Sequence, residues 1–408
     1  MAGTLPRSPL APDHFPELPI IDGVTFAAVE AGVRYSGRLD VMLALCAPGT
    51  AIAGVFTKSA TRSAPVLDCQ AKLGGKSDAG AAILVNAGNA NAFTGRNGTD
   101  AVATVVNRVA EATDLPPNRV FTASTGVIGE PLAHDRITRH LSALVTAQQP
   151  GAIADAAAAI MTTDTYPKGA TQTVQVNGSD VRISGIAKGS GMIAPDMATM
   201  LVYIFTDARM DQAALQSLVS ATADRTFNCI TVDSDTSTSD SLLVAATGAS
   251  GVDVTHSDAF ADALHAVMLD LAHQVVRDGE GATKFVEIAV TGCVDDAAAR
   301  THGLSVANSP LVKTAIAGED PNWGRVVMAV GKSGAPADRD TLSIWFGDTL
   351  VAERGWVSPT YREEDAAAHM KNDHIRIRVD CGMGDGNATI WTCDLTHGYI
   401  DINADYRS

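Results

Sequence analysis

The sequence predicts an α/β protein, of the α+β kind, built of layered sheets that are covered by helices. Short β-rich runs alternate with amphipathic segments along all 408 residues, which is typical of sheets packed beneath helices. Apolar residues make up 46% of the chain and charged residues 19%, a composition that suits packed cores and not disorder. At roughly 100–200 residues per domain, this length predicts two domains or one large two-lobed unit.

Periodicity and turn chemistry predict the individual elements. Valines at helical spacing predict a helix that begins at Thr99, and apolar alternation around Asn177-Gly178 predicts a β-hairpin. Further helices are expected at 135–146, 152–161, 212–226, 257–279 and around Leu311. Strands are expected at 81–85, 119–123, 199–206, 229–232, 285–290 and 341–346, with 375–379 and 388–393 as hairpin partners. A joint between two parts of the chain is expected near residue 199.

The segment 188–206 joins a glycine-rich loop to an apolar strand. Gly189 and Gly191 permit backbone conformations that other residues avoid, and the small residue Ala198 precedes Thr199. This layout is typical of a self-cleaving precursor, in which the Thr199 hydroxyl attacks the Ala198 carbonyl and the resulting ester hydrolyses. The new α-amine, with an ordinary pKa of about 7.7–8.0, then serves as the base for its own hydroxyl. Taken alone, the pattern favours the simpler interpretation that Thr199 begins a buried strand.

Charge and composition exclude several classes of function. Lys and Arg number 30 and Asp and Glu 46, which gives a net charge of −16. Such a chain is repelled by phosphate backbones and anionic lipid, so we expect neither nucleic-acid binding nor membrane docking. Residues 1–19 are proline-rich without an apolar stretch, and no apolar run is long enough to span a bilayer. A cytoplasmic location is therefore expected.

No pattern indicates a metal or a cofactor. The six cysteines are scattered without a CxxC pair, and the ten histidines form no HExxH motif, which predicts buried, reduced thiols and no metal site. Residues 189–194 match GxGxxA, but Pro195 follows and no helix opens there, so a dinucleotide site is not expected.

The run 188–201, KGSGMIAPDMATML, closely resembles the processing motif of the ornithine acetyltransferase (glutamate N-acetyltransferase) family. Other blocks that are similar to this family follow in order along nearly the whole chain. They lie at 53–57, 89–91, 94–95, 124–129, 161–164, 231–238, 280–281, 283–284, 320–325 and 399–406. The resemblance favours self-cleavage over the simpler interpretation of Thr199.

The resemblance implies an N-terminal-nucleophile-like, self-processing fold and a specific reaction. One precursor would be cut before Thr199 into an α chain (1–198) and a β chain (199–408) that stay associated, two of each. N2-acetylornithine would acetylate Thr199 and release ornithine, and glutamate would collect the acetyl group, a ping-pong transfer in arginine biosynthesis. In some family members acetyl-CoA also acetylates the enzyme, which makes acetyl-CoA a second candidate substrate. No cofactor is implied.

The resemblance also assigns roles to residues of both chains. Thr199 matches the nucleophile, Ala198 and Thr199 flank the cleaved bond, and Thr125 and Gly126 match an oxyanion hole. The substrate contacts would be Thr162, Lys188, Thr199, Glu280, Asn403 and Ser408. Lys188 suits a substrate carboxylate and Glu280 a substrate amino group, whereas Asn403 and Ser408 would require an ordered C-terminal tail.

Two other classes of function use the same residues. An acyl-Thr intermediate that reacts with water would make the chain an N-terminal-nucleophile amidohydrolase or aminopeptidase. A chain that is never cut, with Thr199 only structural, would be a small-molecule-binding protein. Two measurements distinguish the transferase, the hydrolase and the binding protein. The N-termini of the protein show whether the chain is cut, and the dependence of product release on an acceptor amine separates the transferase from the hydrolase.

Overall fold

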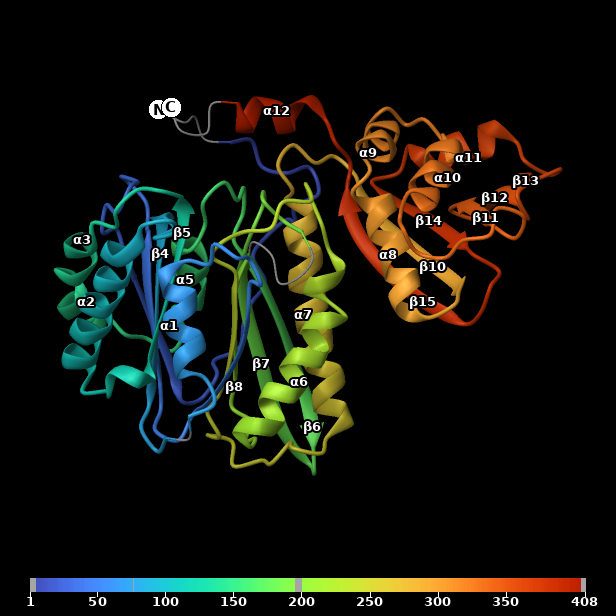
Figure 1. Cartoon of the computed structure of the whole chain (residues 1–408). Coiled ribbons are helices and arrows are strands. Elements are labelled where there is room, and N and C mark those ends of the chain that lie inside the picture. Colours follow the sequence, from blue (N-terminus) through green and yellow to red (C-terminus); the bar gives the residue numbers. More distant parts are fainter. Residues whose placement is uncertain (1–4, 76, 195–199, 405–408) are drawn as a thin grey trace. The chain divides into compact units, whose positions relative to one another are not determined.

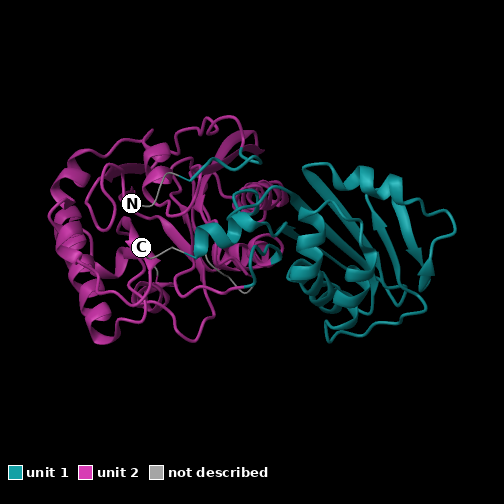
Figure 2. Ribbon diagram, turned by 90° about the horizontal axis from the view of Figure 1, so that it is seen from above, with its two compact units in different colours: residues 1–11, 229–234, 276–408 teal, residues 12–228, 235–275 magenta. Residues whose placement is uncertain are grey.

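The computed structural model describes residues 5–75, 77–194 and 200–404 (Figure 1). The chain divides into two compact units (Figure 2). The larger unit comprises residues 12–228 and 235–275, and the smaller comprises 1–11, 229–234 and 276–408. The predicted joint near residue 199 is wrong, because β7 (Ser179–Lys188) and β8 (Leu201–Thr206) pair antiparallel in one sheet of the larger unit.

Two sheets and covering helices form the larger unit, which confirms the predicted class of layered sheets covered by helices. The four-stranded sheet has the order β1 (Val24–Val29), β2 (Val41–Cys46), β4 (Ala81–Asn89), β5 (Val120–Val127). The five-stranded sheet has the order β3 (Ala51–Phe56), β9 (Ser241–Ala246), β8, β7, β6 (Lys168–Val176). Both contribute to one buried core, where the rings of Phe26 and Phe205 meet edge to face with centroids 4.9 Å apart.

Helices cover the outer faces of these sheets. The valines of α2 (Gly95–Thr113), including Val102 and Val105, pack against Val41 and Leu84 of the four-stranded sheet. Helix α7 (Asp258–Arg277) packs so closely on β7 that a Cβ atom on Gly185 would lie 2.9 Å from a Leu271 methyl.

Glutamine side chains of the covering helices bind backbone groups on both edge strands of the five-stranded sheet. Gln274 of α7 accepts a hydrogen bond from the Gly169 N–H (3.2 Å) and donates one to the Gly169 carbonyl (2.8 Å) on β6. Gln216 of α6 (Gln212–Asp224) makes the same two bonds with Gly54 on β3, at 3.0 and 2.9 Å. Edge backbone groups that are paired in this way do not offer a template for another chain.

Several predicted boundaries are wrong. Helix α2 begins at Gly95, before Thr99, and no side chain caps it. The helix predicted at 135–146 is two short ones, α3 (His134–Thr138) and α4 (Leu141–Thr146). The strand predicted at 229–232 is a single bridge at Ile230 that follows a 3₁₀ turn, since a short apolar run does not distinguish a strand from other buried structure.

The smaller unit contains a six-stranded sheet. Its order is β13 (Trp356–Val357), β12 (Thr349–Glu353), β11 (Ser343–Phe346), β14 (His374–Asp380), β10 (Phe285–Cys293), β15 (Gly386–Cys393). The predicted hairpin of 375–379 with 388–393 is wrong, because β10 lies between β14 and β15, parallel to the first and antiparallel to the second.

Helices also pack in the smaller unit. Helix α8 (Asp296–Ala307) lies on β10 and β15, where a Cβ atom on Gly303 would come within 2.6 Å of Ile390. The others are α9 (Pro310–Ala317), α10 (Trp323–Gly331), α11 (Glu363–Met370) and α12 (His397–Asn403). Over the ranges given above for the structure, no helix combines the length and apolarity needed to cross a membrane.

Candidate active site

The predicted nucleophile Thr199, its neighbour Ala198 and the C-terminal Ser408 lie outside the described residues. The two ends of the segment that carries the predicted cleavage are described. Lys188 is the last residue of β7 and Leu201 the first of β8, and these two are register partners in the sheet. The segment therefore connects two neighbouring antiparallel strands of the five-stranded sheet.

Lys188 and Thr125 are brought together from two different sheets. The Lys188 ammonium donates a hydrogen bond to Thr125 Oγ1 at 3.1 Å. Thr125 belongs to β5, and both side chains are nearly buried, with Lys188 4% and Thr125 6% exposed. The strand predicted to end before Ser124 runs on to Val127, so Thr125 stands on a rigid strand and not in a turn.

Gly126 follows Thr125 at a place where two strands approach closely. It pairs with Gly88 of β4 in the parallel ladder and has φ +125°, a conformation that favours glycine. A Cβ atom at position 126 would lie 2.4 Å from the Gly88 carbonyl carbon. Glycine at position 126 is therefore dictated by backbone geometry at the end of β5.

Gly126→Ala is expected to destabilise the larger unit by about 1–3 kcal/mol, because the added methyl group must push two backbones apart. Gly129→Ala is the matched control. Gly129 also has a positive φ (+85°), but a Cβ atom there would meet nothing within 4 Å. Thermal unfolding of both variants checks the prediction, and equal losses of stability would contradict it.

Asp164 links the two predicted substrate residues Thr162 and Lys188. Its Oδ1 accepts hydrogen bonds from the Lys168 ammonium (2.6 Å) and from the Gly189 N–H (2.7 Å), and its Oδ2 accepts one from the Thr162 N–H (2.9 Å). The Asp164 and Lys168 side chains are both fully buried. The Asp164 carboxylate thus holds two backbone segments in place. One is the turn that contains Thr162, and the other is Gly189, which follows Lys188.

The charge of Asp164 is set by its neighbours. Burial alone would raise the pKa of this carboxyl, but the positive charges of Lys168 and then Lys188 outweigh that effect and hold its pKa below the usual value. Asp164 is therefore ionised at neutral pH, and its negative charge compensates buried lysines.

Sequence reasoning missed the roles of several polar residues around this group. Asp164 lies in the block 161–164, which resembles the family, but nothing in the local sequence indicates a role for it or for Lys168. Arg38 donates to the Met161 carbonyl at 2.7 Å and thereby holds the same turn. The sequence shows only that Asp164 and Lys168 are four residues apart. That spacing is also typical of exposed ion pairs on helices, so it does not indicate a buried pair.

In the smaller unit the structure brings Glu280 and Asn403 together. Asn403 Nδ2 donates a hydrogen bond to Glu280 Oε2 at 2.6 Å, and Glu280 is 8% exposed. Asn403 is the last residue of α12, so this position lies in a helix. These two residues belong to the smaller unit, whereas Thr125, Thr162 and Lys188 belong to the larger one.

The turn at Gly281 explains why α12 lies beside Glu280. Gly281 has φ +73°, and a Cβ atom there would lie 2.5 Å from the Tyr399 nitrogen. The Thr396 hydroxyl donates to the Gly281 carbonyl at 2.7 Å and also accepts from the Gly398 N–H, which caps the helix. The absence of a side chain at position 281 thus allows the C-terminal helix to dock there.

The chain is similar to known proteins over nearly its whole length. The sequence model of the ArgJ family matches residues 25–408. The chain belongs to the ArgJ family. The ArgJ-family relative from Ruegeria pomeroyi, an arginine biosynthesis bifunctional protein, is 70% identical over 408 residues and is aligned over the full length of both chains. The corresponding protein of Gluconobacter oxydans is 56% identical, over 100% of this chain and 97% of its own.

Two ArgJ-related crystal structures are also similar to parts of the chain. The arginine biosynthesis bifunctional protein of Bacillus halodurans has 41% identity and a TM-score of 0.48, over 50% of this chain and 99% of its own. The ornithine acetyltransferase of Mycobacterium tuberculosis, crystallised with ornithine, has 31% identity and a TM-score of 0.36, over 48% of this chain and 96% of its own.

Proposed function

We propose that this ArgJ-family chain is an acetyltransferase of arginine biosynthesis that moves an acetyl group from N2-acetylornithine to glutamate. As a second activity it makes N-acetylglutamate from acetyl-CoA. The observation that carries this proposal is the end-to-end, 70% identical match to an arginine biosynthesis bifunctional protein. The buried contact between Lys188 and Thr125, next to the segment of the predicted cleavage, supports acyl transfer at that place.

Thr199 is the proposed acyl acceptor. Its α-amine, freed by cleavage after Ala198, takes the proton from the Thr199 hydroxyl as the oxygen attacks the acetyl carbonyl of N2-acetylornithine. The C–N bond breaks, the amine of ornithine leaves with that proton, and an acetyl ester remains on Thr199. The amino group of glutamate then attacks the ester and regenerates the hydroxyl.

Thr125 and Gly126 are the proposed donors to the oxyanion in both steps. The Thr125 oxygen accepts from the Lys188 ammonium, and a hydroxyl that accepts a hydrogen bond still has its own O–H to donate. The adjacent positive charge polarises that O–H and strengthens its hydrogen bond to a developing negative charge. Loss of one oxyanion donor typically costs about 10²–10³ in kcat.

Glu280 is proposed to bind the amino group of the substrate, Asn403 its α-carboxylate, and Lys188 and Thr162 further polar groups. Asn403→Ala should raise KM for glutamate by about tenfold or more, because a hydrogen bond to a charged group contributes about 1.5–3 kcal/mol. Steady-state kinetics measure the effect, with Asp401→Ala, an exposed position on the same helix, as the control. An unchanged KM in Asn403→Ala would contradict this role.

Processing and assembly follow from the same proposal. The precursor cuts itself before Thr199, the α chain (1–198) and β chain (199–408) stay together, and two of each form the enzyme. The enzyme works in the cytoplasm, and the transfer itself uses no cofactor, since nucleophile, base and oxyanion donors all come from the chain.

Supplying N2-acetylornithine with and without glutamate tests the reaction. The transferase should release about one ornithine per active site without glutamate, as the acyl-enzyme accumulates, and turn over continuously only with glutamate. Continuous ornithine release that does not depend on glutamate would overturn the proposal and favour an amidohydrolase. Absence of release under both conditions would favour a binding protein that never cleaves.

A further inference from the structure

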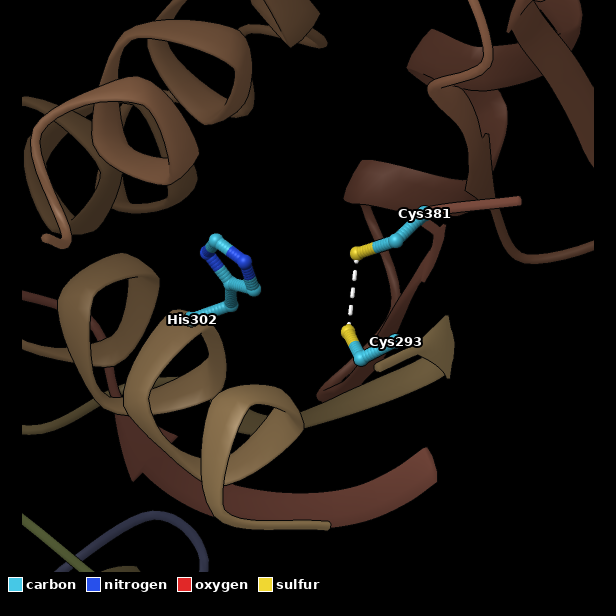
Figure 3. Close-up of side chains that lie close together, drawn as sticks. All are labelled: Cys293, His302 and Cys381. Carbon is cyan, nitrogen blue, oxygen red and sulfur yellow. Dashed lines mark hydrogen bonds between the residues drawn. The ribbon is translucent and has the colours of Figure 1, made fainter. Parts of the chain in front are cut away.

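Three sulfur and nitrogen donors meet in the interior of the smaller unit, outside the residues proposed for acetyl transfer (Figure 3). Among the described residues, one group could hold a metal ion, and it consists of Cys293, His302 and Cys381. The potential ligand atoms of these three side chains all lie within 4.8 Å of one another. Their exposed fractions are 0%, 0% and 1%. Figure 3 shows the two sulfurs pointing toward each other, with the imidazole of α8 nearby.

The strand order of this unit creates the cluster. Cys293 ends β10 and Cys381 directly follows β14, and these strands are adjacent and parallel, so their carboxyl ends lie side by side. His302 comes from α8, which packs on β10. The two sulfurs are 2.9 Å apart. The three residues are far apart in the sequence, which is why spacing motifs gave no sign of a site and the sequence predicted none.

The imidazole is held by hydrogen bonds at both nitrogens. Nδ1 lies 2.9 Å from the Ser333 hydroxyl, and Nε2 lies 3.0 Å from the Pro336 carbonyl oxygen. Metal-binding histidines usually keep one such bond, which fixes the ring while the other nitrogen coordinates the metal. Coordination here would retain one of these two bonds and replace the other.

We propose that Cys293, His302 and Cys381 bind a Zn²⁺ ion as two thiolates and one neutral imidazole, with water or hydroxide in the fourth position. Soft thiolate and imidazole donors select zinc among the common divalent cations. The three protein ligands bring a charge of −2 to the dication, so the buried site is neutral before the fourth ligand binds, which avoids the cost of an uncompensated buried charge.

Binding exchanges protons for the metal. Both thiols lose their protons as the two Zn–S bonds form, so two protons are released for each ion. A tetrahedral site with Zn–S bonds of about 2.3 Å separates its sulfurs by about 3.8 Å. The sulfurs must therefore move apart by about 0.9 Å from the distance of 2.9 Å in the structure, which rotation about the side-chain torsions provides.

The burial of both sulfurs limits their oxidation. Cys293 and Cys381 are 0% and 1% exposed, so oxidants reach them less readily than they reach exposed thiols. A bound cation deprotonates its thiol ligands outright, which gives the two sulfurs the negative charge that zinc coordination needs.

Zinc content and a cobalt spectrum of the full-length protein test the proposal. Protein produced with zinc in the medium should contain about one zinc per chain after gel filtration. Metal-free protein titrated with Co²⁺ should develop sulfur-to-cobalt charge-transfer bands and the intense visible bands of a tetrahedral site, with saturation at about one equivalent.

Cys293→Ser and Cys381→Ser should each lose the zinc and the charge-transfer bands, while Cys69→Ser, a buried cysteine of the larger unit, should keep both. Circular dichroism shows whether each variant is folded, and the wild-type cobalt spectrum does not depend on any variant. Absence of zinc together with absence of the cobalt bands, metal retained in both variants, or a Cys293–Cys381 disulfide in freshly purified protein would overturn the proposal.

Discussion

Thr199→Ala is expected to give one uncleaved chain without acetyltransferase activity. The substitution removes the hydroxyl that both attacks the Ala198 carbonyl and accepts the acetyl group, so processing and transfer are lost together. Loss of a nucleophile in comparable acyl-transfer enzymes costs on the order of 10⁶ in kcat. A denaturing gel and an ornithine-release assay on the same preparation measure the two effects.

Thr199→Ser is the control for that experiment, because it keeps a hydroxyl nucleophile and removes only a methyl group. It should still be cut and should retain measurable transfer. Cleaved, active Thr199→Ala protein would contradict the assignment, since it would require another nucleophile. Fully active but uncleaved Thr199→Ala protein would contradict the need for a free α-amine.

Asp164→Asn is expected to destabilise the larger unit by about 3–5 kcal/mol. It leaves the fully buried Lys168 ammonium without its counter-charge, and breaking a buried pair from one side typically costs this amount. Processing should also slow, because the acceptor that fixes the Gly189 N–H is weakened. Chemical denaturation and the time course of cleavage measure the two effects.

The pH dependence provides a second test of Asp164. Its pKa is lowered in the folded state, so its contribution to stability is fully present above its unfolded value of about 3.9 and is lost as pH falls through the folded pKa. The stability difference between wild type and Asp164→Asn should be constant from neutral pH to about pH 5 and shrink in acid. The exposed Arg108–Glu111 pair is the control, and Glu111→Gln should change stability by less than about 1 kcal/mol.

Elements with strong local signals were predictable from the sequence. Asn177 and Gly178 have φ of +52° and +80°, as expected for a tight hairpin turn, and β6 and β7 pair on either side of them. Ser257 accepts a hydrogen bond from the Phe260 N–H at 3.2 Å at the start of α7, which confirms it as a helix cap. In both cases the determining contacts lie within a few residues of one another.

Long-range pairing was not predictable in this way. Periodicity places 375–379 and 388–393 in strands, but it carries no information on which strand lies between them, and β10 separates them. The approach of Cys293 to Cys381 depends on that order. The larger unit's link between Asp164 and Gly189 likewise joins segments whose local sequences contain no sign of each other.

The candidate site shows what a family resemblance adds to local patterns. A Thr-Gly pair on a strand and a lysine near glycines have ordinary structural explanations, and only the resemblance grouped Thr125 with Lys188 and Glu280 with Asn403. The structure places the members of each pair within hydrogen-bond distance. Their roles in the reaction stay predictions, for which the variants above are the tests.

The intact mass of wild-type protein after incubation with N2-acetylornithine alone tests self-cleavage and acyl transfer in one measurement. We expect two fragments, one ending at Ala198 and one beginning at Thr199, with a single added acetyl group on the peptide that begins with Thr199. An uncut chain that still transfers acetyl groups would contradict the role of Thr199, and so would an acetyl group on any other residue.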